Sequence, residues 1–286
     1  RVSVLRDGRM VATCPACDLA PDEAIRLMAG RDIAAAKTAA RTPGEVRLRV
    51  RGLRRGRTVR DVSFDVRGGE ILGLAGLVGS GRTELLRAIF GADRADAGDV
   101  QVDDAPPRRF RAPSEAVAAG LAMVPEDRKE DGLFLPRSVR MNITLASIRA
   151  FRRRGGRINE SAEIQAANRI VAAVDLRCHS LEQPVAELSG GNQQKALIGR
   201  WLMRDAAVYL FDEPTRGIDI AAKTAVYSLL DDLARRGKAC VVASSEMEEL
   251  MEICDRIAVL SMGRLVRVFA RGEWTHERLL AAAFDS

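Results

Sequence analysis

Residues 70–91, EILGLAGLVGSGRTELLRAIFG, hold an apolar run, a glycine-rich loop and a helical apolar pattern in direct succession. This order predicts a strand that enters the loop and a helix that begins as the loop ends. The backbone N–H groups of such a loop and of the first helical turn converge on one point, where they bind phosphate. A tight turn at a strand end is the structural alternative, but the spacing G-x-x-x-x-G-[KR]-T is more specific than that.

The loop supplies the first candidate site residues. We expect it to bind a nucleotide through Gly76, Gly79, Ser80, Gly81, Arg82 and Thr83, with the Thr83 hydroxyl on Mg²⁺. Arg82 stands where such a loop normally carries lysine. A guanidinium keeps the charge but is larger and planar, so it holds phosphate with a poorer fit to the loop.

An acidic pair follows a second apolar run, AVYLF at 207–211. The carboxyl end of a strand is where an open α/β sheet presents its ligand-binding groups. We expect Asp212 to hold the metal through water and Glu213 to act as the catalytic residue that orients or deprotonates an attacking water. Alone, such a pair would be a helix cap or a solvated turn; with the glycine loop upstream it favours a nucleotide site.

Other apolar runs alternate with helical patterns along the chain. Strand candidates lie at 46–50, 62–66, 122–125 and 239–244, and helical patterns lie at 162–176 and 221–237. This alternation predicts an α/β fold with a mostly parallel sheet and helices on both faces.

The composition fits anionic partners. The chain of 286 residues has 45 basic against 39 acidic side chains and a sequence pI near 9.4, which suits nucleotides, nucleic acid or an acidic membrane surface. Its five cysteines are an odd number, and those at 178, 240 and 254 sit singly in apolar surroundings, as reduced cytosolic thiols do. No apolar run approaches the ~18 residues that span a bilayer, so we expect any membrane-spanning part to belong to a partner.

One pattern occurs twice. RVSVLRDGRMV at 1–11 and RIAVLSMGRLV at 256–266 both read as a hairpin, with Asp7-Gly8 as the first turn, and a helical stretch follows each, at 21–30 and 275–284. A chance match of two ordinary hairpins is the alternative to a repeat. We interpret residues 1–32 as the tail of a preceding homologous domain, 33–44 as a linker and 45–286 as one coherent domain.

The stretches LSGGNQQK at 188–195 and FDEPTRGID at 211–219 resemble the signature and Walker B segments of ATP-binding-cassette (ABC) ATPases. Together with GRTEL at 81–85 and PEDRKEDGL at 125–133, they look most like the second cassette of the tandem ATPases of bacterial monosaccharide importers, of the ribose, galactose and xylose type. The resemblance runs from about Val46 to the C-terminus.

The resemblance implies a P-loop cassette fold: a mostly parallel sheet core, an antiparallel β subdomain and a helical subdomain at about 135–187 that meets membrane-spanning permease subunits. It implies ATP and Mg²⁺ as cofactors and a peripheral place on the cytoplasmic side of the membrane. The implied partners are a first cassette on the same polypeptide, the permease and, indirectly, a periplasmic or extracellular sugar-binding protein, but no nucleic acid. The signature residues, which would serve ATP bound to the first cassette, are Ser189, Gly190, Gly191 and Gln193, and Asp219 ends the D-loop at the cassette interface.

Several positions depart from active cassettes. Besides Arg82, Glu126 stands where a glutamine touches the metal and the attacking water, and Ser245 stands where a switch histidine lies. No aromatic residue lies at 51–58, where a ring stacks on adenine. We therefore predict an ATPase cassette of a sugar importer whose own site holds nucleotide and hydrolyses it slowly or not at all.

Three alternatives remain open. A soluble cassette protein of DNA repair or translation would suit the basic charge, but the chain has no sustained heptad pattern. A binding or regulatory module would clamp nucleotide without turnover. A nucleoside importer of the same type typically lacks the aspartate–glutamate pair in its second Walker B segment, so FDEPTRGID favours sugar.

Overall fold

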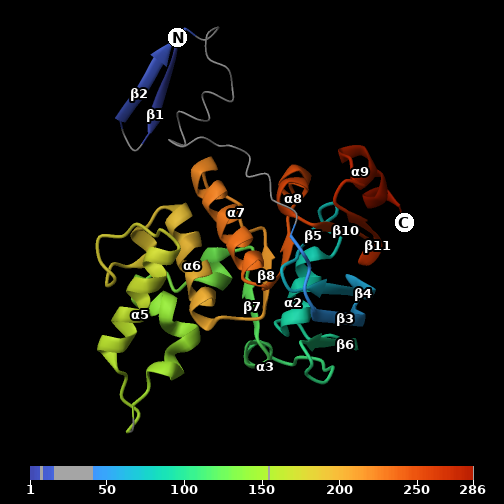
Figure 1. Cartoon of the computed structure of the whole chain (residues 1–286), viewed down its shortest axis with the longest axis horizontal. Coiled ribbons are helices and arrows are strands. Elements are labelled where there is room, and N and C mark those ends of the chain that lie inside the picture. Colours follow the sequence, from blue (N-terminus) through green and yellow to red (C-terminus); the bar gives the residue numbers. More distant parts are fainter. Residues whose placement is uncertain (7–8, 16–40, 154, 286) are drawn as a thin grey trace.

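The computed structural model describes residues 1–6, 9–15, 41–153 and 155–285 (Figure 1). The helical stretch predicted at 21–30, the turn at 7–8 and most of the linker predicted at 33–44 lie outside these residues. Within the described ranges, no helix is both long and apolar enough to cross a bilayer.

The core is a six-stranded sheet in the order β11-β10-β5-β9-β8-β7. Five strands run parallel and β11 is antiparallel to β10. The strands are β5 (Ile71–Ala75), β7 (Leu121–Val124), β8 (Val208–Asp212), β9 (Ala239–Ala243), β10 (Arg256–Ser261) and β11 (Arg264–Ala270).

This sheet separates two apolar cores. Along β8, Val208 and Leu210 pack into one core while Tyr209 and Phe211 pack into the other. Because both faces are covered, the inner strands are continuous apolar runs, as a buried parallel sheet requires. The predicted α/β class with a mostly parallel sheet is therefore correct.

A second sheet is antiparallel, in the order β4-β3-β6, and contains β3 (Val46–Arg55), β4 (Val59–Arg67) and β6 (Ala97–Val102). Its buried face packs on helix α2 (Arg82–Phe90), where Leu85, Leu86 and Ile89 are fully buried. This packing fixes the helix that follows the glycine loop.

The helical region predicted at 135–187 contains α4 (Val139–Thr144), the 3₁₀ segments η2 (Leu145–Phe151) and η3 (Val185–Glu187), and α5 (Glu160–Ala173). Figure 1 shows it on the side of the central sheet opposite the antiparallel sheet. Helix α6 (Gly190–Arg204) packs against α4 and α5. Arg200 links α6 to α4 and to the turn that ends at Gly132, because its buried guanidinium donates to the carbonyls of Gly132 at 2.6 Å and Asn142 at 2.7 Å.

The remaining helical elements complete the cover of the sheet. They are α3 (Pro113–Ala118), the π-helical turn η1 (Arg128–Gly132), α7 (Ile220–Arg235), α8 (Met247–Ile253) and α9 (His276–Phe284).

The repeated sequence pattern forms the same hairpin twice. Strands β1 (Val2–Arg6) and β2 (Arg9–Cys14) pair antiparallel, as β10 and β11 do. Val2 pairs with Cys14 as Ile257 pairs with Phe269, and every later pair in one hairpin has its counterpart in the other. Both registers also shift at the same step, Val4/Leu5 in the first hairpin and Val259/Leu260 in the second.

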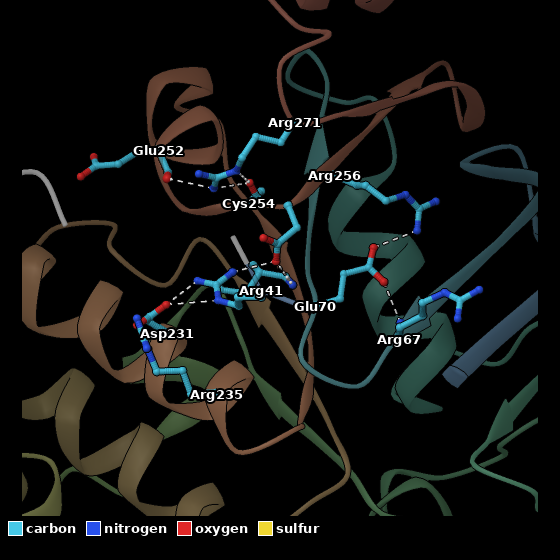
Figure 2. A network of polar contacts seen from close by, with 11 residues as sticks. Arg41, Arg67, Glu70, Asp231, Arg235, Glu252, Cys254, Arg256 and Arg271 are labelled. Carbon is cyan, nitrogen blue, oxygen red and sulfur yellow. Dashed lines mark hydrogen bonds and ion pairs between the residues drawn. The ribbon is translucent and has the colours of Figure 1, made fainter. Parts of the chain in front are cut away.

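Ion pairs of Arg41 tie the start of this domain to helix α7 and to the residue before β10, as Figure 2 shows. Arg41 contacts Asp231 of α7 at 2.6 Å and Asp255 at 2.7 Å, with only 7% of its side chain exposed. Burial alone would lower the pKa of Arg41, but the hydrogen bonds and charges of the two carboxylates raise it. Asp255 also accepts from the backbone N–H of Ile71 at 2.9 Å, so one cluster joins this segment, α7 and β5.

Candidate functional site

The glycine loop packs closely on its neighbours. Gly81 has φ +100°, and a Cβ on it would lie 2.2 Å from the carbonyl oxygen of Thr58. Only glycine fits there, and α2 begins at the next residue. The loop and the first amides of α2 are thereby held at the carboxyl end of β5, as the sequence predicts.

Three neighbouring strands bring the other candidates to the same edge. Because β9 lies between β5 and β8, the segments that follow these three strands meet where a parallel sheet presents its ligand-binding groups. The structure thus brings the predicted residues Arg82, Thr83, Asp212, Glu213 and Ser245 together.

Asp212 is the most deeply placed carboxylate of the group. It is 1% exposed, and burial raises its pKa to about 6. Thr83 donates its hydroxyl to Asp212 Oδ1 at 3.1 Å. In the part of the chain that the structure describes, neither the buried Asp212 Oδ2 nor the buried Ser80 Oγ has a hydrogen-bond partner. Oxygen atoms are the ligands that Mg²⁺ prefers, so these residues fit a magnesium–phosphate group.

Arg82 is buried against the ends of β8 and β9. Its guanidinium donates to the carbonyl of Ser244 and lies 3.6 Å from Glu213 Oε1. Burial lowers the pKa of Arg82, while the charges of Glu213 and Asp212 oppose that shift. The positive charge of Arg82 therefore lies between the Ser244 carbonyl and Glu213, the expected catalytic residue.

Glu213 is held from two sides. Ser245 donates its hydroxyl to Glu213 Oε2 at 3.1 Å, and Arg82 lies beside the other oxygen. The backbone of Glu213 has φ +46° and its N–H donates to the carbonyl of Ala243 at 2.9 Å. Ser245 thus lies beside the carboxylate of Glu213.

Glu126 lies just past β7, the strand next to β8. Its carboxylate forms an ion pair with Arg216, in the D-loop at 215–219. Asp219, the last residue of that loop, caps α7 by accepting from the N–H of Ala222 at 2.9 Å.

The predicted signature residues form the start of α6. Ser189 is exposed and is the N-cap, accepting from the N–H of Asn192 at 3.4 Å, and Gly190 begins the helix. Gln193 faces inward: it is 6% exposed and donates to the carbonyl of Val185 at 3.2 Å. The open part of this helix end therefore consists of Ser189 and the half-buried Gly190. Together with the buried Gly191 they form what we call the signature end (residues 189–191).

Two residues of this region escaped the sequence analysis. Glu249 of α8 is 2% exposed and accepts from the hydroxyls of Thr215, at 2.6 Å, and Ser244. Arg128 contacts both the D-loop and Gln193. The sequence analysis assigned a role only to Glu126 in the segment EDRKEDG and none in MEELMEI, and the tertiary fold brings Arg128 and Glu249 to the site.

A cavity of about 510 Å³ lies beside the Glu126 segment, between α2, α3 and α6. Its wall includes Phe90 and Trp201, whose rings meet edge to face at 6.0 Å. Charged side chains line it as well: Arg87, Arg149, Arg204 and the buried Arg200, with one carboxylate, Asp131, which pairs with Arg87. The hollow is thus lined by apolar residues and by more arginines than carboxylates.

A family model described as ABC transporter matches residues 59–216. The chain is 46% identical over 284 residues to the ribose import ATP-binding protein RbsA 3 of Rubrobacter xylanophilus (strain DSM 9941 / JCM 11954 / NBRC 16129 / PRD-1), a match that covers 99% of this chain and 57% of that protein. It is also similar to the ribose/galactose/methyl galactoside import ATP-binding protein 1 of Rhizobium meliloti (strain 1021). The two are 45% identical over 285 residues, and the match covers 99% of this chain and 56% of that protein. The chain spans about half the length of these relatives.

Solved structures agree with the fold. An ATP-binding cassette of an ABC transporter, MJ1267 in its ADP conformation, superposes with a TM-score of 0.69 at 18% identity and covers 84% of this chain and 99% of its own. The dimeric cassette MJ0796 bound to ADP and Pi gives 0.66 at 21% identity and covers 79% of this chain and 100% of its own. The predicted cassette fold, with its parallel core and antiparallel β subdomain, is confirmed.

Proposed function

The chain belongs to the ABC transporter family, and on that premise we propose that it is the second ATP-binding cassette of an importer for a monosaccharide of the ribose, galactose or xylose type. The names of the relatives support sugar import. In this proposal the cassette serves the partner cassette's nucleotide with its signature end and holds a second nucleotide in its own degenerate site.

The repeated hairpin supports the proposal that this chain is a second cassette. In this chain β10 and β11 close the central sheet, so a preceding cassette of the same fold would end in the same hairpin. Residues 1–14 have that hairpin, with the same register and the same shift, and the relatives are nearly twice as long. A first cassette upstream accounts for both observations.

The degenerate site is proposed to bind Mg-ATP and to turn it over slowly. The loop amides and the start of α2 would hold the phosphates, and Thr83 with Asp212 would hold Mg²⁺, which supplies charge neutralisation when bound. Glu213 would be the catalytic carboxylate, but Arg82 and Ser245 already engage both of its oxygens. Glu126 is likewise paired, with Arg216, so its oxygens are directed to the D-loop.

The signature end is proposed to act in trans. Ser189 is exposed, and the first N–H groups of α6 together with the helix dipole favour a negative group there. In a head-to-tail pair of cassettes that group is the γ-phosphate of ATP bound by the first cassette. Hydrolysis coupled to transport would then occur mainly at the site that this chain completes for its partner.

The cavity beside the Glu126 segment is proposed to receive the permease. Its apolar lining and its excess of arginines over carboxylates suit a short amphipathic helix that carries aliphatic or aromatic residues and carboxylates. The protein would thereby lie at the cytoplasmic face of the membrane, while a sugar-binding protein on the other side selects the cargo.

A reconstitution tests this function. The two-cassette protein and its permease are placed in vesicles, and ATP hydrolysis is measured with a sugar-binding protein loaded with ribose, galactose, xylose or a nucleoside. We expect stimulation by one of the sugars. Stimulation by nucleoside alone would assign the nucleoside class, and stimulation by DNA or ribosomes without the permease would assign the repair or translation class.

A further inference from the structure

We propose that Arg128 is a positioning residue that holds the signature end and the D-loop at a fixed spacing. It follows the Glu126 position by two residues and begins the π-helical turn η1. The inference rests on the proposed role of the signature end in trans, and it adds a residue to which the sequence assigns nothing.

The guanidinium of Arg128 contacts two different motifs at once. Nη1 donates to the carbonyl of Arg216 at 3.0 Å and Nη2 to that of Gly217 at 3.4 Å, both in the D-loop. Nε donates to Gln193 Oε1 at 3.3 Å, in the first turn of α6. Gln193 in turn donates to Val185, so the tie reaches the segment that leads into the signature end.

The two glycines of the signature end lie directly against this link. A Cβ on Gly190 would lie 2.8 Å from Arg128 Nη2 and 3.3 Å from the carbonyl oxygen of Gly217. A Cβ on Gly191 would lie 2.6 Å from the Cβ of Ala222, in the first turn of α7. The helix start, the arginine and the D-loop are therefore in close contact, and a displacement of one displaces the others.

Only arginine can make these contacts together. Its planar group carries five N–H donors in a fixed fork, so three acceptors in different directions are reached by one side chain. Lysine keeps the charge but has a single nitrogen on a flexible stem and cannot span the same acceptors. Arg128→Lys is consequently a conservative substitution in charge and a disruptive one for the link.

A second residue of the same short segment also contacts the D-loop. Glu126 pairs with Arg216, whose carbonyl also accepts from Arg128. The 126–128 segment lies in the chain between Pro125 and Asp131 of the cavity wall, and it is thereby joined by three contacts to the D-loop and by one to α6. Motion imposed on this segment would reach the signature end through Arg128.

Hydrogen exchange on this chain tests the link. We expect Arg128→Lys to speed exchange about 10-fold both for the hydrogen-bonded amides of residues 192–193 and for those of residues 222–223, because charge-assisted bonds to Gln193 and to the D-loop are lost. The matched control is Arg271→Lys, since Arg271 also binds two backbone carbonyls, those of Glu252 and Cys254, but lies after β11, outside α6 and the D-loop. Faster exchange in only one of the two segments, in neither, or equally in the control overturns the proposal.

Kinetics of the two-cassette protein with its permease test the consequence. We expect Arg128→Lys to lower kcat about 10- to 100-fold at nearly unchanged KM for ATP, because misplacing the signature end affects the reacting geometry more than nucleotide binding. A general loss of fold would instead lower the melting temperature and act equally in Arg271→Lys. If Ser189→Arg abolishes turnover and Arg128→Lys does not change kcat, Arg128 has no positioning role; if Ser189→Arg is also silent, the proposed role in trans fails first.

Discussion

The guanidinium of Arg82 lies 3.6 Å from the carboxylate of Glu213, so the cation of the phosphate loop and the expected catalytic base of the same site are paired with each other. Both side chains are about nine-tenths buried, which makes the attraction stronger than on the surface. Phosphate binding must compete with this contact. The pairing gives the proposed slow turnover at this site a physical basis beyond the arginine in place of lysine.

The first prediction concerns the chain by itself. We expect weak binding of Mg-ATP and slow or absent turnover, because Arg82 is engaged and no partner signature completes the site. Isothermal titration measures the binding and phosphate release measures the turnover. Steady-state release at an ordinary enzymatic rate of about 1 s⁻¹ or more would contradict the expectation.

The second prediction restores the consensus residues at this site. Arg82→Lys alone should recover little activity, because Glu126 and Ser245 remain, and residues that act as a unit do not contribute additively. Adding Glu126→Gln and Ser245→His should recover more than any single change. The assay is ATP turnover in the two-cassette protein whose first-cassette loop lysine has been removed. Near-normal turnover from Arg82→Lys alone would show that Arg82 is the only residue that slows ATP hydrolysis at this site.

The third prediction compares the two sites. Ser189→Arg should abolish sugar uptake because it blocks the exposed signature end, and Gly190→Asp should do the same through charge and through contact with Arg128 and Gly217. Arg82→Ala should cost less. Ser228→Arg is the matched control, since Ser228 is exposed on α7 and its hydroxyl donates only within that helix in the described contacts. The reverse ranking of Ser189 and Arg82 variants would reject the assignment of roles.

The fourth prediction concerns pH and needs no nucleotide. Burial raises the pKa of Asp212 to about 6 from an ordinary value of 3.8, so the folded chain binds more protons than the unfolded chain between these values. Stability contributed by this group therefore falls as pH rises from about 4 to 6 and stays low above that. In EDTA, Asp212→Asn should be more stable than the original chain at pH 7.5, by roughly 1–3 kcal/mol, and the difference should vanish near pH 4. Urea unfolding at several pH values measures it, and a gain that does not depend on pH would point to another cause.

The fifth prediction addresses Glu249. Glu249→Ala leaves the hydroxyls of Thr215 and Ser244 without their buried acceptor and should destabilise the chain by about 2–4 kcal/mol. Glu249→Gln keeps the shape and one acceptor oxygen, so it should cost less. Equal losses in the two variants, measured by urea unfolding, would mean that the hydrogen bonds are not the reason for the burial.

Elements with a strong local pattern were predictable from sequence. The helix predicted at 221–237 is α7 (Ile220–Arg235), and the apolar run at 207–211 is β8 (Val208–Asp212). The helix predicted at 162–176 ends three residues earlier, at Ala173, because Asp175 takes a left-handed φ of +49° and the chain turns. Leu176 is buried beyond that turn, so an apolar residue extended the pattern without extending the helix.

The candidate site likewise contains residues whose place could be predicted from sequence and residues whose place could not. Asp212 ends β8, while Thr83 and Ser245 follow β5 and β9, so a parallel sheet brings them to one edge and their proximity could be predicted. Glu249 and Arg128 depend on contacts between segments far apart in the chain, 34 residues for Thr215 with Glu249 and 88 for Arg128 with Arg216. Their sequence surroundings are charged, and nothing local distinguishes them from solvated side chains.

The repeated hairpin has a practical consequence for handling this chain. Among the described residues β1 pairs only with β2, whereas its counterpart β10 also pairs with β5. A two-stranded sheet alone is marginally stable in water, and its open edge is a template for adding a strand from another molecule. We therefore expect concentration-dependent self-association through β1, and removal of residues 1–40 should give a monodisperse sample while Arg41 and the six-stranded sheet stay in place.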